Sequence, residues 1–337
     1  MVGLDNFDDF YDESIKRGNL AGAMDHEGFT LTEGDIRDPL FLQALPDGIH
    51  AIVHLAARAG VRPSIEQPVL YSDVNLMGTS ELLALARERE MGAFVFASSS
   101  SVYGNNEKVP FSEDDPVDHP ISPYAATKKS GELLCQAAAH LDAITMACLR
   151  FFTVYGPRQR PDLAIHKFAR ILRDGGEIPM FGDGTTSRDY TYIDDILAGV
   201  TAALDWVVQR SGQGAYEIIN LGESRTVTLP AMIQVIGEEM GKEPSIRRLP
   251  MQPGDVQRTF ADVSKARRVL GYEPSVDFPD GIRRFLAWFV AGECCERRSG
   301  WAGGSGGSLS GHGRSGLHRV PPGGDPAGRG RPGPGPG

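Results

Sequence analysis

The chain has 337 residues, of which 41% are hydrophobic and 23% are charged, and its net charge is -10. This composition is typical of a soluble globular protein with one large domain or two modest ones. The acidic balance, without any stripe of Lys and Arg, disfavours nonspecific binding to nucleic acid.

The chain shows no signal-peptide pattern and no apolar stretch long enough to span a bilayer, so we expect no membrane partner and a cytoplasmic location. The four cysteines show neither metal-ligand spacing nor a disulfide framework. Cys135 and Cys148 lie in apolar runs and are predicted to be core residues. The eight histidines show no ligand spacing either, so we predict no metal site, and His54 is expected to be a core residue.

Short apolar runs alternate with helical patterns through the first half of the chain. This alternation predicts an α/β fold, a doubly wound parallel sheet covered by helices on both faces. Ligands of such folds bind at the carboxyl ends of the strands, where the informative polar residues of this chain lie. The predicted strands cover 2–4, 29–31, 51–55, 93–97 and 144–149, and the clearest helices cover 75–90 and 123–140.

The second half of the chain is less regular. From about residue 300 onward the composition collapses into Gly, Pro, Ser and Arg without hydrophobic periodicity. Such a segment cannot bury a core, so we expect it to be disordered. Before it, helical patterns cover 163–174, 194–208, 229–240 and 281–290, and 190–193 is strand-like.

Tyr124 and Lys128 are four residues apart on the predicted helix 123–140, so they project from one face. This pairing suits redox chemistry on an alcohol, because an ammonium stabilises a tyrosinate and lets the tyrosine act as a base well below its usual pKa of about 10. A serine of the run 98–101 could share the substrate proton. A surface Tyr and Lys on an ordinary helix would show the same spacing, but Pro123 and the strand that ends in serines favour the functional interpretation.

Several motifs in one order resemble the extended short-chain dehydrogenase/reductase superfamily. The nucleotide-sugar epimerases, and among them the UDP-glucuronate 4-epimerases, are the most similar members. The resemblance runs from about Val2 to about Phe289. The motifs are DNFDDFYD at 5–12, GDIRD at 34–38, HLAARAGVR at 54–62, ASSSSVYG at 97–104, YAATKK at 124–129, LRFFTVYGPR at 149–158, RDYTYIDDI at 188–196 and PGDV at 253–256.

The resemblance implies three parts: an NAD-binding Rossmann-like domain at 1–160 that also uses about 190–210, a lobe at 161–290 mainly for the UDP-sugar, and a tail at 291–337. The family's first strand and its glycine-rich turn, which cradles the cofactor diphosphate, are not in this sequence. We hypothesise that both ends reflect a truncated or misread reading frame, with a frameshift near Cys294. The alternative is a protein that has lost its phosphate loop and is catalytically inactive.

The resemblance also implies NAD as the cofactor. Asp5 is expected to accept hydrogen bonds from the adenosine ribose and to favour NAD over a 2′-phosphorylated cofactor, although it could simply begin a turn. The remaining cofactor-binding residues are expected to be Asn6 beside it, Asp35 and Ile36 around the adenine, Ala56 and Ala57 at a strand end, Asn75 behind the nicotinamide, and Tyr124 and Lys128.

The reaction implied is 4-epimerisation of a UDP-sugar through a transient 4-keto intermediate. Tyr124 takes the proton of the 4-hydroxyl, the hydride of C4 passes to NAD and returns to the other face, and Tyr124 gives the proton back. Lys128 is expected to lower the pKa of Tyr124 and to bind the nicotinamide ribose. Ser99 is expected to be the third catalytic residue. NAD is regenerated in each cycle and should behave as a bound prosthetic group.

Neighbouring positions separate the subfamilies. Similar dehydratases carry Asp-Glu in place of Ser100 and Ser101, and decarboxylases carry Glu in place of Ser101. This chain has neither acid at these positions, so the acid-base groups that eliminate water in the dehydratases are missing. In the glucuronate epimerases, residues placed as Ser100, Ser101, Thr153 and Arg160 hold the sugar carboxylate, which opposes loss of carbon dioxide from the β-keto acid. UDP-glucose/UDP-galactose epimerisation stays open, because Arg160 could be a solvated loop arginine.

Arg188 and Asp255 are expected to bind the UDP, with help from Arg258, and structural salt bridges are the alternative for each. We therefore expect an NAD-dependent isomerase that converts UDP-glucuronate into UDP-galacturonate for surface polysaccharide. The helices at about 75–90 and 123–140 resemble the interface helices of the family, which predicts a homodimer. A noncatalytic nucleotide-sugar-binding protein is the alternative of another class.

Overall fold

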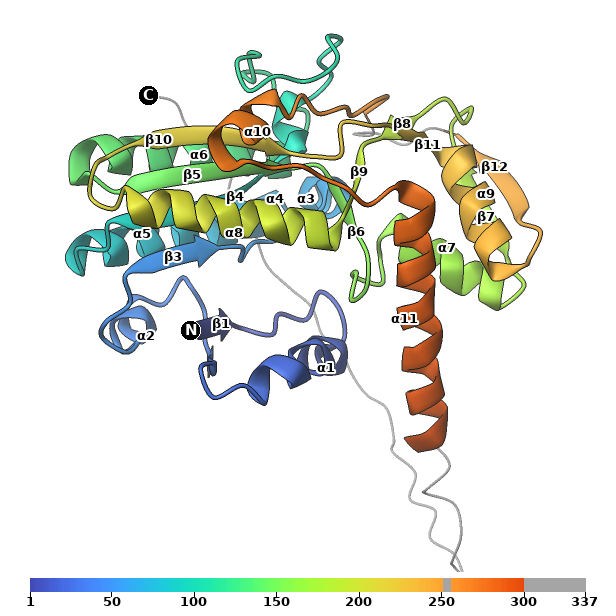
Figure 1. The fold of residues 1–337 in the computed structure, drawn as a ribbon, viewed down its shortest axis with the longest axis horizontal. Coiled ribbons are helices and arrows are strands. Elements are labelled where there is room, and N and C mark those ends of the chain that lie inside the picture. The colour runs from blue at the N-terminus through green and yellow to red at the C-terminus, as the bar shows by residue number, and fades with distance from the viewer. Residues whose placement is uncertain (251–255, 300–337) are drawn as a thin grey trace, which may run out of the picture. The chain divides into compact units, whose positions relative to one another are not determined.

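A parallel sheet of four strands is the main framework of the fold (Figure 1), and its order is β10–β5–β4–β3. Each neighbouring pair is parallel, and every residue of β4 is buried. The sequence patterns predicted three of these strands, whereas β10 was not predicted. The strands are β3 (Ala51–His54), β4 (Ala93–Ser99), β5 (Thr145–Phe151) and β10 (Tyr216–Leu221).

The computed structural model describes residues 1–250 and 256–299. Residues 1–293 form one unit, and residues 294–337 belong to a second one. The disorder expected from about residue 300 onward and the predicted role of Asp255 lie outside the described residues. The described helices include none that is long and apolar enough to cross a membrane.

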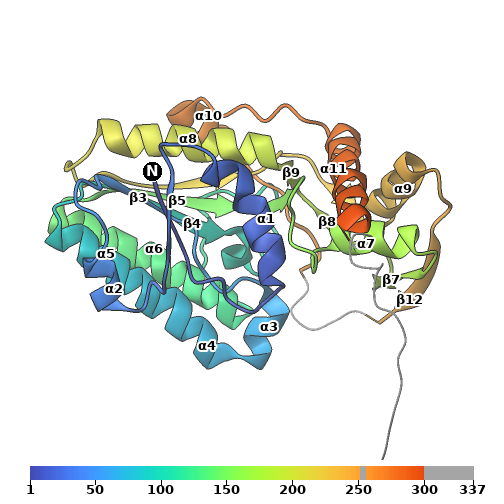
Figure 2. The same ribbon diagram turned by 90° about the horizontal axis from the view of Figure 1, so that it is seen from below.

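Alternate side chains of β4 enter two different cores, as expected for a sheet that is covered on both faces. Phe94 and Phe96 pack with α5 (Gly78–Glu88) and α6 (Pro123–Asp142), whereas Val95 packs with α8 (Ile193–Gln209). Figure 2 shows α8 on one side of the sheet and α5 and α6 on the other. The core that contains Phe94 and Phe96 also contains Cys135 and Cys148, which are buried as predicted.

The first two strands, β1 (Val2–Asp5) and β2 (Thr30–Glu33), pair in parallel as a separate sheet. Helix α1 (Glu13–Met24) connects them, and the Asp12 side chain caps it by accepting the N–H of Ser14. Among the described residues, β1 and β3 each have only one strand neighbour. The prediction of a doubly wound α/β fold is confirmed, but its parallel strands are divided between two sheets. A strand preceding Val2 stays a hypothesis.

Helical segments run almost without interruption from α3 to α5, whereas α2 lies between β2 and β3. A π-helical turn, η1, lies in the middle of this stretch, and such turns often occur at functional sites. A short 3₁₀ turn, η2, directly follows β4. The segments are α2 (Pro39–Gln43), α3 (Val61–Glu66), α4 (Pro68–Ser72), η1 (Asp73–Met77) and η2 (Ser100–Tyr103).

The later part of the chain builds a third core, which includes Phe168, Met232 and Phe285. Helix α9 agrees with the predicted range 229–240, α7 lies close to its predicted range, and α11 contains the predicted range 281–290 but begins earlier and ends later. The division of the chain near residues 160 and 290 stays a prediction. The elements are β6 (Thr153–Tyr155), α7 (Ala164–Arg173), β7 (Glu177–Phe181), β8 (Ser187–Arg188), β9 (Tyr190–Tyr192), β11 (Val227–Thr228), α9 (Leu229–Met240), β12 (Ser245–Leu249), α10 (Ser264–Leu270) and α11 (Phe278–Ser299).

Candidate active site

Helix α6 begins beside the end of β4 and places Tyr124 in its first turn. Ser122 caps the helix by accepting the N–H of Ala125 at 3.1 Å, and Pro123 fits the first helical position. The Tyr124 phenol interacts with the Ser99 hydroxyl at the end of β4. The structure therefore brings together Tyr124 and Ser99, which lie 25 positions apart in the sequence.

Lys128 lies one turn further along α6 and is 4% exposed. Its Nζ donates a hydrogen bond to the carbonyl oxygen of Ala97 at 2.7 Å and lies over the Tyr124 ring, 5.9 Å from the ring centre. Burial lowers the pKa of the Lys128 ammonium to about 8. Lys128 thus belongs to the same group as Tyr124 and Ser99, and we name these three residues the catalytic group.

The ionisation of Tyr124 differs from the prediction. Burial raises the pKa of Tyr124 above its ordinary value, and the Ser99 hydroxyl and the charge of Arg160 act against that rise. The Lys128 ammonium donates to the Ala97 carbonyl and lies over the Tyr124 ring, and its predicted effect on the pKa of Tyr124 stays a prediction. Ser99 and Arg160 are the groups that favour the tyrosinate in this structure.

A first pocket lies where β1, β2 and β3 end, and we name it the cofactor pocket. Its walls include most of the predicted cofactor-binding residues. The Asp5 carboxylate also accepts the N–H of Phe7 at 2.7 Å, so it begins a turn and faces the pocket at the same time. The predicted residues in its walls are Asp5, Asn6, Asp35, Ile36, Ala56 and Ala57.

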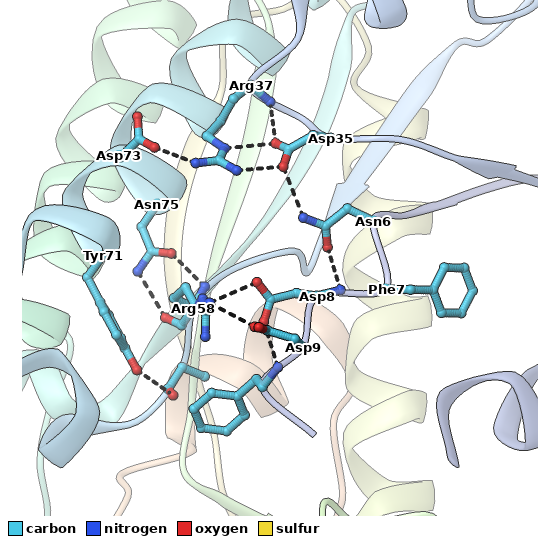
Figure 3. A network of polar contacts seen from close by, with 12 residues as sticks. Asn6, Phe7, Asp8, Asp9, Asp35, Arg37, Arg58, Tyr71, Asp73 and Asn75 are labelled. Atoms are coloured by element: carbon cyan, nitrogen blue, oxygen red, sulfur yellow. Dashed lines mark hydrogen bonds and ion pairs between the residues drawn. The ribbon is translucent and has the colours of Figure 1, made fainter. Parts of the chain in front are cut away.

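Figure 3 shows the polar network beside this pocket. Asn6 donates to Asp35 at 3.0 Å, and Arg37 holds the same carboxylate through Nε and Nη2. The guanidinium of Arg37 keeps the pKa of Asp35 far below its usual range, and Arg37 also contacts Asp73 of η1. The network holds the ends of β1 and β2 against the π-helical turn and keeps Asp35 ionised.

Asn75 is buried in η1, and its amide is fully engaged by protein groups. Its oxygen accepts the N–H of Arg58 at 2.8 Å, and its nitrogen donates to the Arg58 carbonyl and to Thr127 Oγ1, each at 3.0 Å. Asn75 therefore joins the segment after β3 to α6. Because its polar atoms are bound to protein groups, Asn75 fits a position behind the wall of the cofactor pocket and not in the wall itself.

The chemistry of these residues fits NAD. The carboxylates of Asp5 and Asp35 can accept hydrogen bonds from ribose and adenine groups. Arg58, which also lines the pocket, contacts Asp8 at 2.9 Å, and its Nε is buried without a hydrogen-bond partner among the described residues. A guanidinium beside these carboxylates suits the anionic diphosphate of a dinucleotide.

A second pocket lies beside η2, and we name it the sugar pocket. Four of the predicted substrate residues line it: Ser100, Ser101, Thr153 and Arg188. Arg188 donates to the carbonyl of Ser187 at 2.9 Å. Arg258 is exposed and lies next to Thr259, which lines the pocket. None of the described residues in its walls is an Asp or Glu.

Arg160 lines the cofactor pocket and not the sugar pocket. It donates to both oxygens of Asp162, at 3.0 and 2.9 Å, and its guanidinium lies 5.1 Å from the centre of the Phe10 ring. The expected carboxylate clamp is therefore not assembled in this structure, because Arg160 holds a protein carboxylate.

Sequence reasoning missed several residues that line the pockets. Most of them lie within or beside the quoted motifs, but their side chains meet in one pocket only after folding. In the cofactor pocket they are Asp8, Phe10, Tyr11, Lys16, Arg58 and Val74, and in the sugar pocket Val61, Gly104, Ile121, Ser122 and Thr259.

His54 is buried, as predicted. Its Nε2 lies 2.9 Å from Thr79 Oγ1, and its Nδ1 has no hydrogen-bond partner within the described ranges of the chain. Burial lowers the pKa of His54 to about 3. In the part of the chain that the structure describes, no group of three or more His, Cys, Asp or Glu could hold a metal ion.

The family assignment follows from comparison with known proteins. The family model described as GDP-mannose 4,6 dehydratase matches residues 2–285. The chain belongs to this family of NAD-dependent epimerases and dehydratases, which are extended short-chain dehydrogenases/reductases with a Rossmann fold.

Within the family, the chain is similar to proteins named UDP-glucuronate 4-epimerase. The one of Thermodesulfobacterium geofontis is 40% identical over 291 residues, which cover 86% of this chain and 88% of the relative. UDP-glucuronate 4-epimerase 3 of Arabidopsis thaliana is 40% identical over 305 residues, which cover 86% of this chain and 70% of the relative.

Solved structures agree with this similarity. UDP-glucuronic acid 4-epimerase of Bacillus cereus, crystallised with UDP-glucuronic acid and NAD, has a TM-score of 0.78 and 34% identity, with coverage of 86% of this chain and 90% of that one. The dTDP-glucose 4,6-dehydratase DesIV of Streptomyces venezuelae, with NAD bound, has a TM-score of 0.77 and 30% identity, with coverage of 89% and 88%. The fold is therefore common to epimerases and dehydratases, and the site must separate them.

Proposed function

We propose that this chain is an NAD-dependent isomerase that converts UDP-glucuronate into UDP-galacturonate. The observation that carries the proposal is the position of the catalytic group, beside a sugar pocket whose described walls contain hydroxyl groups and an arginine but no carboxylate. The similarity to epimerases at about 40% identity supports the same conclusion.

The chain's own residues supply proton transfer and orientation. The Tyr124 phenolate oxygen receives the proton of the sugar 4-hydroxyl and becomes a neutral phenol, which returns the proton after inversion, and the Ser99 hydroxyl stabilises the phenolate form. Lys128 provides a buried cation next to the ring. When bound, NAD would accept the hydride from C4 and return it to the opposite face of the 4-keto sugar.

The described walls of the sugar pocket contain no Asp or Glu, which favours epimerisation over dehydration. Elimination of water needs a general acid and base beyond Tyr124, and the positions next to Ser99 are Ser100 and Ser101. Hydroxyl groups there can donate to a sugar carboxylate but cannot shuttle protons near neutral pH. Epimerisation, which needs no acid or base beyond the catalytic group when NAD is bound, is the reaction that these side chains support.

Two features support a carboxylate on the sugar of the substrate. Ser100, Ser101 and Thr153 line one pocket with hydroxyl donors. Arg160 already holds a carboxylate, that of Asp162, in the paired geometry that a substrate carboxylate would take. UDP-glucose/UDP-galactose epimerisation is the second candidate, since Arg160 does not line the sugar pocket.

The test is to incubate the protein and NAD with UDP-glucuronate and, separately, with UDP-glucose, and to resolve the products by anion-exchange chromatography. We expect UDP-galacturonate from the acid and far slower inversion of the neutral sugar. Faster inversion of UDP-glucose would refute the acid as substrate. A protein that binds UDP-sugars but inverts neither would be the noncatalytic alternative.

We also propose that the protein is a homodimer. Large apolar side chains of η1 and α6 are exposed, at 52% for Met77, 54% for Leu133 and 76% for Leu141, and a second copy would cover such a surface. Light scattering that reports a monomer at micromolar concentration would contradict this proposal. A cytoplasmic location and a role in surface polysaccharide synthesis stay predictions.

A further inference from the structure

A buried ion pair lies directly behind the catalytic group. Glu132 of α6 and Arg150 of β5 are each 1% exposed, and they meet through two parallel bonds, Nε to Oε1 at 2.8 Å and Nη2 to Oε2 at 2.9 Å. Glu132 follows Lys128 by one helical turn and Tyr124 by about two. The pair therefore belongs to the same helix face as the catalytic group.

The ion pair also binds the strand and the turn that carry the serines. Ser98 donates from Oγ to Glu132 Oε1 at 2.6 Å, and Ser98 directly precedes Ser99. Arg150 donates from Nη1 to the Tyr103 hydroxyl at 3.0 Å, and Tyr103 ends the turn that begins with Ser100. One network thus fixes α6, the end of β4 and η2 relative to one another.

The contact between α6 and β4 is unusually close at this level. A Cβ atom added to Gly131 would lie 2.3 Å from Cζ of Phe96, so only glycine allows the helix to approach the strand in this way. The bond from Lys128 to the Ala97 carbonyl joins the same two elements. Small shifts of the helix along or away from β4 would therefore change the distance between Tyr124 and Ser99.

We propose that Glu132 and Arg150 are positioning residues for the catalytic group, because their pair and its bond to Ser98 set the spacing between Tyr124 and Ser99. The role in turnover depends on the proposed function. Stability alone does not account for the pair, because apolar side chains of similar size often replace a buried ion pair without loss of stability. What apolar packing cannot replace is the direction of the hydrogen bonds to Ser98 and Tyr103.

Ser98→Ala is the decisive variant, since it removes a single buried hydroxyl from the network. Thr145→Val is the matched control, because Thr145 is equally buried and donates to the Arg210 carbonyl at the opposite end of the sheet. The first measurement needs no substrate. Tyrosine labelled with ¹³C at Cζ gives one signal for Tyr124, assigned by its loss in Tyr124→Phe. We expect Ser98→Ala to move this signal and Thr145→Val to leave it in place.

Turnover is the second measurement. We expect kcat to fall about tenfold in Ser98→Ala, with KM unchanged within about twofold, because a displaced catalytic group affects the chemical step more than binding. The double variant Glu132→Met/Arg150→Met should keep its Tm within about 5 °C of the wild type and lose about 100-fold in kcat.

Three results would overturn the proposal: an unchanged Tyr124 signal in Ser98→Ala, a kcat loss no larger than in Thr145→Val, or a stable double variant with normal kcat. If the wild-type protein inverts no UDP-sugar, the proposed function fails, whereas the Tyr124 signal still decides whether the network positions the catalytic group.

Discussion

Replacement of Arg160 by Met separates the acidic substrate from the neutral one. Arg160 is 25% exposed, holds Asp162 through two bonds and lies against Phe10. Methionine keeps an apolar side chain against Phe10 but removes the guanidinium. If the arginine transfers from Asp162 to the sugar carboxylate when substrate binds, the acid loses an interaction that the neutral sugar does not make, whereas loss of the Arg160 charge near Tyr124 affects both sugars alike.

The structure sets the size of the effect. A hydrogen bond to a charged group contributes about 1.5–3 kcal/mol, which corresponds to roughly 10- to 150-fold in kcat/KM for UDP-glucuronate. Substrate must replace the bonds between Arg160 and Asp162, so we expect a loss in the lower part of this range. Loss of an exposed ion pair costs at most about 1 kcal/mol of stability, so the variant should fold normally.

The assay compares kcat/KM for UDP-glucuronate and UDP-glucose by chromatography of the products, in wild type, Arg160→Met and Arg158→Met. Arg158 is a matched control because it is an exposed arginine of the same loop. We expect a loss of about tenfold or more for the acid in Arg160→Met alone. Equal losses on both sugars, or the same loss in Arg158→Met, would refute the clamp.

Two further predictions concern the catalytic group and the buried histidine. Tyr124→Phe should lower kcat by about 10²–10⁴-fold, the usual contribution of a general acid-base group, with Tm preserved, and inversion at the wild-type rate would contradict our assignment. The folded-state pKa of His54, about 3, lies below its unfolded value of about 6.5, so the stability that neutral His54 contributes is lost as the pH falls from 6.5 toward 3. Between pH 7 and pH 5 the wild type should lose about 2 kcal/mol more unfolding free energy than His54→Gln in urea titrations, and parallel losses would show that His54 is not the cause.

Local patterns were sufficient for much of the fold. The strand runs ending at Asp5 and Ser99 and the helix beginning at Pro123 were predictable, because alternating burial and helix capping depend on neighbouring residues. Helix α1 was missed because none of its residues is buried, so it carries no apolar stripe. Strand β10 was missed because its position depends on pairing with β5, which is distant in the sequence.

The sequence by itself determined which side chains make up the candidate site, because Tyr124 and Lys128 share a helix face and Ser99 ends a strand. Only the tertiary structure decided how these groups ionise and what holds them. Burial raises the pKa of Tyr124 where spacing predicted a lower one, since desolvation depends on every segment that packs around the phenol. The pairings of Arg160 with Asp162 and of Glu132 with Arg150 likewise depend on the folded chain, because spacing in the sequence does not specify which charges meet.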